Sequence, residues 1–228
     1  MVDVVVCDIE GTTTPIDFVH RILFPYAAKE LPAYIRANLT SDPVQTGLAM
    51  VRQTVREEDA RDLDDEQCIE QLLTWIESDR KHPGLKLLQG KVWAFGYQAG
   101  AFTSELYPDV LPQLKKWRQA GKKVGIYSSG SVEAQKLLFG HTSDGDVNDL
   151  LDFYFDTAVG GKKEADSYSK ITQELRVPDP GIICFLSDVV AELDAAAAAG
   201  MQTFQVVRPG TDAGMVHPTV ARFDQLPF

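Results

Sequence analysis

The strongest constraint on the fold is an apolar strand that ends in two acidic residues. Residues 2–7 form a nearly continuous β-branched run, which is typical of a strand buried on both faces of a parallel sheet. Asp8 and Glu10 follow it directly, and the chain breaks at Gly11. Ligands of open α/β sheets bind at the carboxyl ends of the strands. Two acids at such an end therefore predict a bound cation, with Mg²⁺ the simplest choice, unless this is an ordinary acidic turn.

From about Tyr107 onward, the sequence alternates between helical and strand patterns. The predicted strands lie at 123–127, 153–156, 182–186 and 203–207, and the predicted helices around 110–120, 132–140, 168–175 and 191–199. Such alternation implies right-handed crossovers and a parallel sheet with helices on both faces. The fold class is therefore α/β, with a Rossmann-like parallel-sheet core.

A long helical stretch interrupts this core after the first strand. Apolar residues recur at helical spacing around 18–27, 48–55 and 69–76, and no convincing strand occurs between Pro15 and Gly100. We therefore expect an all-helical inserted domain at 15–103. The α/β core domain is expected to combine 1–14 with 104–228.

Composition narrows the functional classes. The 22 basic and 33 acidic residues give a net charge of −11, which argues against nucleic-acid partners but allows a locally positive pocket for a phosphorylated small molecule. Cys7, Cys68 and Cys184 are odd in number and widely spaced, which favours a reducing cytoplasm over a disulfide framework. The chain enters a strand at once and contains no apolar run of about 20 residues, so neither a signal peptide nor a membrane partner is expected.

Polar residues follow the later predicted strands as well. Ser128 and Ser129 follow the strand at 123–127, Asp188 follows the one at 182–186, and Lys162 lies in a glycine-rich loop. Each alone has a bland interpretation, because serines cap helices, loop lysines are solvated and aspartates form turns. Together they form an ordered set of acid, hydroxyl, amine and acid at one edge of the sheet.

This ordered set resembles the motifs of the haloacid dehalogenase-like phosphohydrolase superfamily. Residues 8–12 (Asp-Ile-Glu-Gly-Thr) match its first motif, with Glu10 in place of the second aspartate. Ser128, Lys162 and the pair Asp188 and Glu192 match the remaining three motifs. The resemblance covers nearly the whole chain, and the helical insertion resembles the superfamily's cap domain.

Longer strings narrow the resemblance to the enolase-phosphatases of methionine salvage. Residues 8–16, 22–26 and 127–141 are similar to that family, which also carries glutamate at position 10. The family enolises 2,3-diketo-5-methylthiopentyl 1-phosphate and then removes the phosphate, leaving an acireductone. The resemblance implies a monomer with one Mg²⁺ per subunit and a phosphorylated diketone as its partner.

The resemblance also implies roles for the site residues. Asp8 is the candidate nucleophile, and the side chain of Glu10 is the candidate acid and base. Ser128 and Lys162 would hold phosphoryl oxygens. Asp8, Asp188 and the backbone carbonyl of Glu10 are the candidate metal ligands.

Several assignments stay open. Ser129 is a candidate for binding substrate oxygens, and Glu192 either orients Lys162 or a metal-bound water or is a plain first-turn acid. The enolisation base is undecided, with Glu10 the candidate, and Lys162 or the metal would be the electrophile. The aromatic residues of the insertion either close over the methylthio tail or form its core: Phe18, His20, Trp93 and Tyr97. The alternatives for the whole chain are another capped phosphatase or mutase and a phospho-acceptor signalling module.

Overall fold

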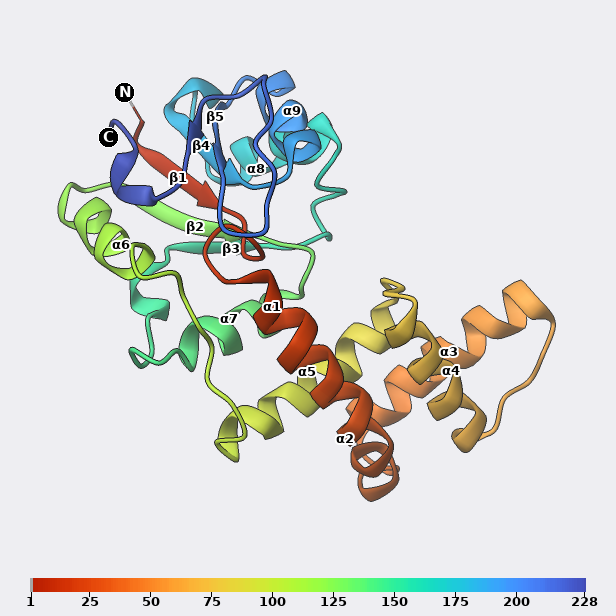
Figure 1. Ribbon diagram of the computed structural model, residues 1–228. Helices are drawn as coiled ribbons and strands as arrows, with labels where there is room; N and C mark the ends of the chain where they lie inside the picture. The colour runs from red at the N-terminus through yellow and green to blue at the C-terminus, as the bar shows by residue number, and fades with distance from the viewer. Residues whose placement is uncertain (1) are drawn as a thin grey trace. The chain divides into compact units, whose positions relative to one another are not determined.

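The computed structural model describes residues 2–228, and the chain divides into two compact units (Figure 1). Unit 1 comprises the residues up to Phe18 together with Thr103–Phe228, and unit 2 comprises Val19–Phe102. The domain boundaries expected from the sequence lie at 14/15 and 103/104. Unit 1 is thus assembled from both ends of the chain.

Unit 1 contains a six-stranded parallel sheet in the order β3-β2-β1-β4-β5-β6. Its strands are β1 (Val4–Cys7), β2 (Lys123–Tyr127), β3 (Phe153–Phe155), β4 (Ile183–Ser187), β5 (Gln202–Val206) and β6 (Thr219–Val220). The strand β1 pairs with β2 on one side and with β4 on the other, so it lies inside the sheet. The predicted parallel α/β core is confirmed.

Helices cover both faces of this sheet (Figure 1). The helices α8 (Ala165–Glu174) and α9 (Val190–Ala198) lie on one face, and α6 (Val110–Gln119) and α7 (Val132–Gly140) lie on the other. On the first face, Val4 and Val6 belong to one buried cluster with Phe185, Ile171 and Leu193. Because side chains alternate along a strand, this cluster fixes which residues beyond the strand ends share that face.

Two features of unit 1 differ from the sequence expectation. The edge strand β6 was not predicted, because Thr219–Val220 is too short to produce a hydrophobic pattern. The helix α8 begins at Ala165, three residues before the predicted start, since its first turn is polar. Short 3₁₀ turns complete the unit at Asn148–Leu150, Pro180–Ile182 and Phe223–Gln225.

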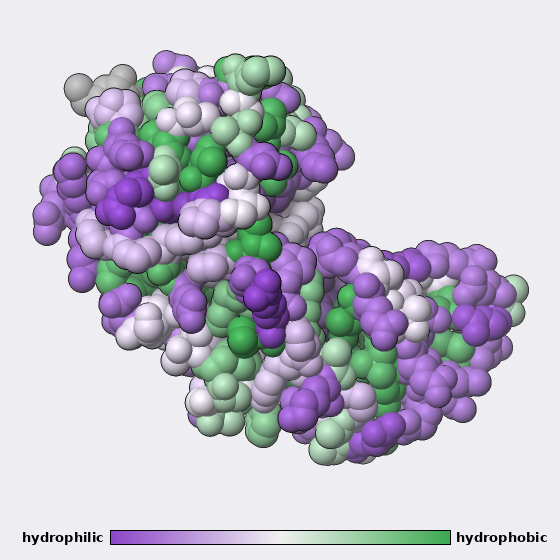
Figure 2. Space-filling view, viewed as in Figure 1, coloured by the Kyte–Doolittle hydropathy of each residue, from purple (hydrophilic) through white to green (hydrophobic). Residues whose placement is uncertain are grey.

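Unit 2 is entirely helical, as predicted. The short helix α1 (Ile16–Phe18) ends the first segment of unit 1, and unit 2 begins with a π-helical turn at Val19–Leu23. The helices of unit 2 are α2 (Phe24–Ala37), α3 (Asp42–Asp59), α4 (Asp65–Glu77) and α5 (Pro83–Gln98). Their apolar faces meet in a separate hydrophobic core that includes Leu31, Leu48, Leu72 and Leu88, all fully buried. Unit 2 therefore has its own core. Most of the surface of unit 2 that Figure 2 shows is hydrophilic.

Capping residues set the helix boundaries of unit 2. Asp64 forms a capping box with Gln67 at the start of α4. His82 caps α5 by accepting a hydrogen bond from the Gly84 N–H at 3.1 Å, and Pro83 occupies the first turn. The aromatic residues Trp93, Phe95 and Tyr97 all lie in the second half of α5. Within residues 2–228, no helix is long and apolar enough to span a bilayer.

Candidate active site

Strand register places Asp8 on the face that α8 and α9 cover. Val4, Val6 and Asp8 share one side of β1 by alternation, as Ile183, Phe185 and Ser187 share one side of β4. The backbone N–H of Asp8 donates to Leu186 at 2.8 Å, which continues the ladder to the strand end. Asp8 and Ser187 therefore meet at the carboxyl edge of the sheet.

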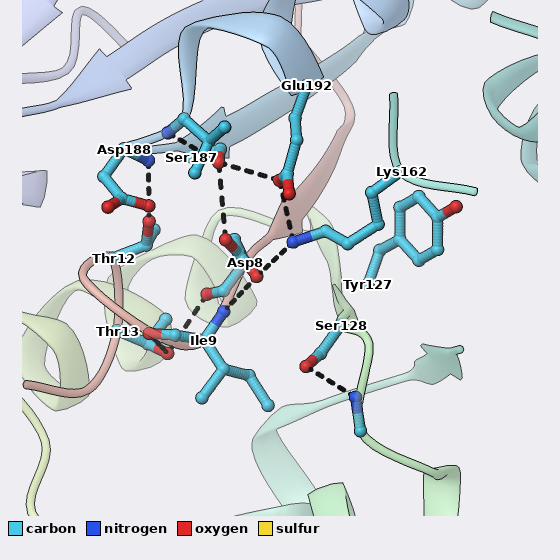
Figure 3. Close-up of polar contacts among 12 residues, drawn as sticks. Asp8, Ile9, Thr12, Thr13, Tyr127, Ser128, Lys162, Ser187, Asp188 and Glu192 are labelled. Atoms are coloured by element: carbon cyan, nitrogen blue, oxygen red, sulfur yellow. Dashed lines mark hydrogen bonds and ion pairs between the residues drawn. The ribbon is translucent and has the colours of Figure 1, made fainter. Parts of the chain in front are cut away.

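The Asp8 carboxylate is buried and held mainly through one oxygen (Figure 3). Its Oδ1 accepts from the Ile9 N–H at 2.7 Å and lies 2.6 Å from Lys162 Nζ. Its Oδ2 accepts only a longer hydrogen bond, from Ser187 Oγ at 3.3 Å. One oxygen is thus fixed, while the other keeps lone-pair density for chemistry.

Lys162 joins two carboxylates in a nearly dry setting. Its ammonium lies 2.7 Å from Glu192 Oε2 as well as beside Asp8, and its side chain is only 10% exposed. Burial opposes its charge, but the negative charges of Asp8 and Glu192 outweigh burial and raise the pKa of Lys162. Lys162 therefore stays positively charged in the working range of pH.

Glu192 contacts Lys162, which is one of the roles expected from the sequence. Glu192 also accepts a hydrogen bond from Ser187 Oγ at 3.0 Å. Burial and repulsion from Asp8 raise the pKa of Glu192 to about 7, against the lowering effect of Lys162. Glu192, in the first turn of α9, thus anchors the side chain of Lys162.

The loop that carries Lys162 is itself fixed by hydrogen bonds from unit 1. The Tyr168 hydroxyl donates to the Lys162 carbonyl at 2.7 Å, and the Tyr127 hydroxyl donates to the Gly160 carbonyl at 3.0 Å. Gly160 adopts a φ of +138°, and a Cβ there would lie 2.2 Å from Ser167 Oγ. Only glycine fits this bend, which aims the lysine back at the strand ends.

The turn after Asp8 is equally constrained. Gly11 has a φ of +69°, and a Cβ on it would lie 2.5 Å from Asp188 Oδ2. The Thr13 hydroxyl donates to the backbone carbonyls of Asp8 and Ile9. The Thr12 hydroxyl accepts from the Asp188 N–H at 3.1 Å, which connects the turn to the end of β4 (Figure 3).

The donor set at this edge fits a divalent cation. Asp188 Oδ1 is buried without a hydrogen-bond partner, and burial together with repulsion from Asp8 and Glu10 raises the pKa of Asp188 to about 6. Acidic groups outnumber Lys162 here, so a hard cation would relieve the repulsion. Among residues 2–228, no three His, Cys, Asp or Glu side chains form a ready metal cluster. The resemblance to the haloacid dehalogenase-like hydrolases implies that a metal here would use Asp8, Asp188 and the backbone carbonyl of Glu10.

The serine loop lies at the end of β2, in front of α7. Ser128 is buried, and its Oγ accepts from the Gly130 N–H at 3.2 Å, while Ser129 beside it is half-buried. Ser131 caps α7 by accepting from the Ala134 N–H. The Gln135 amide donates to the carbonyls of Gly130 and Phe155, both at 2.8 Å, and so holds the loop against the sheet.

Sequence reasoning missed the residues that hold the site together. Ser187 directly follows the predicted strand 182–186, and the sequence indicates no role for it, yet its Oγ lies within hydrogen-bonding distance of both Asp8 and Glu192. The signal that could have identified Ser187 is its position beside Asp8 in the register of β1 and β4. Gln205 donates to the carbonyl of Asp188 at 2.9 Å, and nothing local in the sequence marks it.

The aromatic residues singled out in unit 2 form contacts among themselves. Phe24 contacts the rings of His20 and Trp93, with centroids 5.6 and 6.3 Å apart, and Trp93 Nε1 donates to the Leu23 carbonyl. Tyr97 is buried against Phe102. Phe18, in unit 1, is buried. These contacts give the residues a structural role, and a part in binding the substrate tail stays a prediction.

Comparison with known proteins decides the family. The model of the haloacid dehalogenase-like hydrolases matches residues 2–200. Enolase-phosphatase E1 of Klebsiella pneumoniae is 48% identical over 226 residues, which cover 99% of this chain and 97% of that protein. The chain belongs to the enolase-phosphatase family of haloacid dehalogenase-like hydrolases.

Other relatives agree with this membership. The enolase-phosphatase E1 of Sorangium cellulosum is 46% identical over 224 residues, 97% of this chain and 96% of that one. The crystal structure of the UTR4 protein of Saccharomyces cerevisiae superimposes with a TM-score of 0.83 at 35% identity and covers 99% of this chain and all of that chain. The CbbY protein of Rhodobacter sphaeroides, at 17% identity and a TM-score of 0.61, shares the fold. The enolase-phosphatase family therefore accounts for both units of the chain.

Proposed function

We propose that this enzyme is a bifunctional, magnesium-dependent enolase-phosphatase that converts 2,3-diketo-5-methylthiopentyl 1-phosphate into an acireductone and phosphate. The 48% identity over nearly the full length to an enolase-phosphatase supports this function. The observation in the structure that carries the chemistry is Asp8, buried at the end of β1 with Lys162 at 2.6 Å. We further propose a cytoplasmic monomer in which unit 2 serves as the cap domain.

Asp8 is the proposed nucleophile for phosphoryl transfer. Its Oδ2 attacks phosphorus in line with the leaving oxygen, forming an aspartyl phosphate that water then hydrolyses. Lys162 keeps its charge and neutralises phosphoryl oxygens, while Ser128 donates a hydrogen bond to another of them. A single Mg²⁺ held by Asp8, Asp188 and the Glu10 carbonyl would reduce repulsion between the nucleophile and the phosphate.

Glu10 is the proposed proton carrier. It is half-buried, two residues after the nucleophile, and its charge acts on Asp188. The glutamic acid protonates the leaving oxygen, and the resulting carboxylate then removes a proton from the attacking water. A carboxyl group in this place therefore serves both halves of the hydrolysis.

Enolisation uses the same pocket before the phosphate leaves. The carbon that bears the phosphate must lose a proton to a base, and the neighbouring carbonyl oxygen must gain negative charge. Glu10 is the proposed base, and the fixed ammonium of Lys162 is the proposed electrophile for the enolate. Ser129 is proposed to bind the substrate's oxygens.

The test is an assay of both steps on the diketo phosphate. Phosphate release and the ultraviolet absorbance of the conjugated enol are followed together, with and without Mg²⁺. We expect enol to appear before phosphate, and excess chelator to stop phosphate release. If the enzyme hydrolyses a generic phosphate ester but not the diketo phosphate, the proposed substrate is wrong, and the protein is a capped phosphatase of another specificity.

A further inference from the structure

Arg208 connects four segments of unit 1 inside the protein. Its side chain is 3% exposed and forms a two-pronged ion pair with Asp109, with N–O distances of 2.7 and 2.9 Å. It also donates to the carbonyl of Ala221 at 3.0 Å, and Asp109 accepts from the Phe223 N–H at 2.7 Å. The ion pair of Arg208 and Asp109 therefore connects the segment after β5 to parts of unit 1 that are distant in the sequence.

The remaining N–H groups of Arg208 donate to the turn that follows Asp8. The carbonyl of Thr12 accepts two hydrogen bonds, both from Arg208, through Nε and Nη2 at 3.1 Å each. Tyr107, whose ring lies 4.2 Å from the guanidinium carbon, donates its backbone N–H to the carbonyl of Thr13 at 3.0 Å. The guanidinium therefore fixes the turn that follows Asp8 and Glu10.

Thr12 transmits this constraint across the sheet edge. Its hydroxyl accepts the backbone N–H of Asp188, while the Asp188 carbonyl accepts from Gln205. The backbone of Asp188 is thus hydrogen-bonded on both sides of its Cα. Its N–H donates to Thr12, which is itself bonded to Arg208. Its carboxylate, by contrast, has one oxygen without a partner.

We propose that Arg208 is a positioning residue, which sets the place of the Asp188 carboxylate relative to Asp8 by holding Thr12. The inference rests on the proposed function for the role of Asp188 as a metal ligand. Arginine suits this task because its planar fork pairs with Asp109 along one edge and donates to Thr12 from another. A lysine offers a point charge, which can compensate Asp109 but cannot reproduce both sets of bonds.

The experiment compares Arg208→Lys with Thr12→Val in the full-length chain. The first variant keeps a positive charge beside Asp109, and the second removes only the hydroxyl that accepts the Asp188 N–H. The matched control is Arg222→Lys, because Arg222 and Asp224 form an ion pair about half exposed on the same C-terminal segment. Mg²⁺ affinity is measured by calorimetry, kcat and KM on a generic phosphate ester, and folding by thermal unfolding.

We expect Arg208→Lys and Thr12→Val each to weaken Mg²⁺ binding about tenfold and to lower kcat by a similar factor, while KM changes less than about twofold. The double variant should be no weaker than the worse single variant, because both act through one contact. The control should match the parent. The proposal would be overturned by any of three results. The first is normal Mg²⁺ binding in a folded Arg208→Lys, and the second is a loss of Mg²⁺ affinity in the double variant that equals the sum of the two single losses. The third is an unfolded Arg208→Lys beside a Thr12→Val with normal Mg²⁺ binding. Failure of the parent on the diketo phosphate alone would refute only the proposed substrate.

Discussion

At the scale of single residues, substitution of Asp8, the proposed nucleophile, is the most decisive test of the mechanism. Asp8→Asn keeps the shape of the side chain and its place beside Lys162 but removes the attacking oxygen's charge. We expect phosphate release to fall at least about a thousandfold, because the aspartyl phosphate does not form. Enolisation needs only a base and an electrophile, so the enol phosphate should accumulate when Mg²⁺ still binds. Parallel assays of phosphate and of enol absorbance measure both outcomes.

Glu10→Gln is the matched comparison for Asp8→Asn. Glu10 is the proposed proton carrier in both steps, so this variant should impair enol formation as well as phosphate release. An Asp8 variant that forms no enol, beside a Glu10 variant that forms it normally, would refute this division of labour. Phosphate release by Asp8→Asn within about tenfold of the parent would refute the nucleophile itself.

Lys162 offers a second residue-scale prediction, with its neighbour as control. Lys162→Ala removes the buried charge between Asp8 and Glu192 and should lower kcat at least about tenfold. Lys163→Ala should leave kcat unchanged, because Lys163 is exposed. Steady-state kinetics at saturating Mg²⁺ distinguish them. Equal kinetics in the two variants would return Lys162 to the interpretation of a solvated loop residue.

The sequence predicts site residues that belong to a motif or directly follow a predicted strand. It does not predict residues that reach the site only because of how the strands are paired. The sequence motifs single out Asp8, Lys162 and Glu192, and in the structure Lys162 lies within hydrogen-bonding distance of both carboxylates. Ser187 and Arg208 were not given roles, since their contacts depend on which strand lies beside β1 and how the chain returns from unit 2. Those facts are set by long-range packing, which no local pattern encodes.

At the scale of elements, the start of α5 carries a pH-sensitive cap. His82 Nδ1 accepts from the Gly84 N–H, so the neutral ring carries its proton on Nε2 and donates it to Thr54 Oγ1, 2.9 Å away. Burial, followed by the charge of Arg80, lowers the pKa of His82, against the opposite effect of Glu58. The folded state thus favours neutral histidine.

The sign of the pH effect follows from this lowered pKa. Above about pH 6.5, His82 is neutral in both states, and its contribution to stability is fully present. As the pH falls below that value, the unfolded chain binds the proton first, so stability declines until the pH passes the lowered pKa. We expect the unfolding temperature of the parent to fall between pH 7 and 5 more steeply than that of His82→Asn, which caps without titrating. Identical slopes for parent and variant would contradict this assignment.

Element boundaries show where local signals suffice. The predicted strand at 123–127 coincides with β2, because its apolar run is bounded by lysines and serines. The helix α5 runs through the aromatic residues at 93, 95 and 97 without a break, although it contains glycines at 90 and 96. At Gly96, for example, a Cβ would lie 2.7 Å from the ring of Tyr26. Close packing, visible only in three dimensions, explains the glycine at position 96.

At the scale of the whole molecule, each of the two units contains a hydrophobic cluster of its own among residues 2–228. The candidate site residues Asp8, Glu10, Asp188 and Lys162 all belong to unit 1, whereas unit 2 is an insertion between Phe18 and Thr103. Because β1 pairs on both sides, a cut within unit 2 would leave the N-terminal segment held in the sheet. We therefore expect that unit 2 can lose stability while β1 stays paired in the sheet of unit 1.

Two matched leucine substitutions test this independence. Leu48 in α3 is fully buried in the core of unit 2, and Leu193 in α9 is fully buried in that of unit 1. Each Leu→Ala change should cost about 2–5 kcal/mol of its own unit's stability. Under limited proteolysis at rising temperature, Leu48→Ala should be cut first within 19–102, with the N-terminal fragment co-eluting with the remainder, while Leu193→Ala should be cut first in unit 1. The same cleavage map for both variants would show instead that the units unfold as one, and that a lesion in either core reaches the catalytic edge.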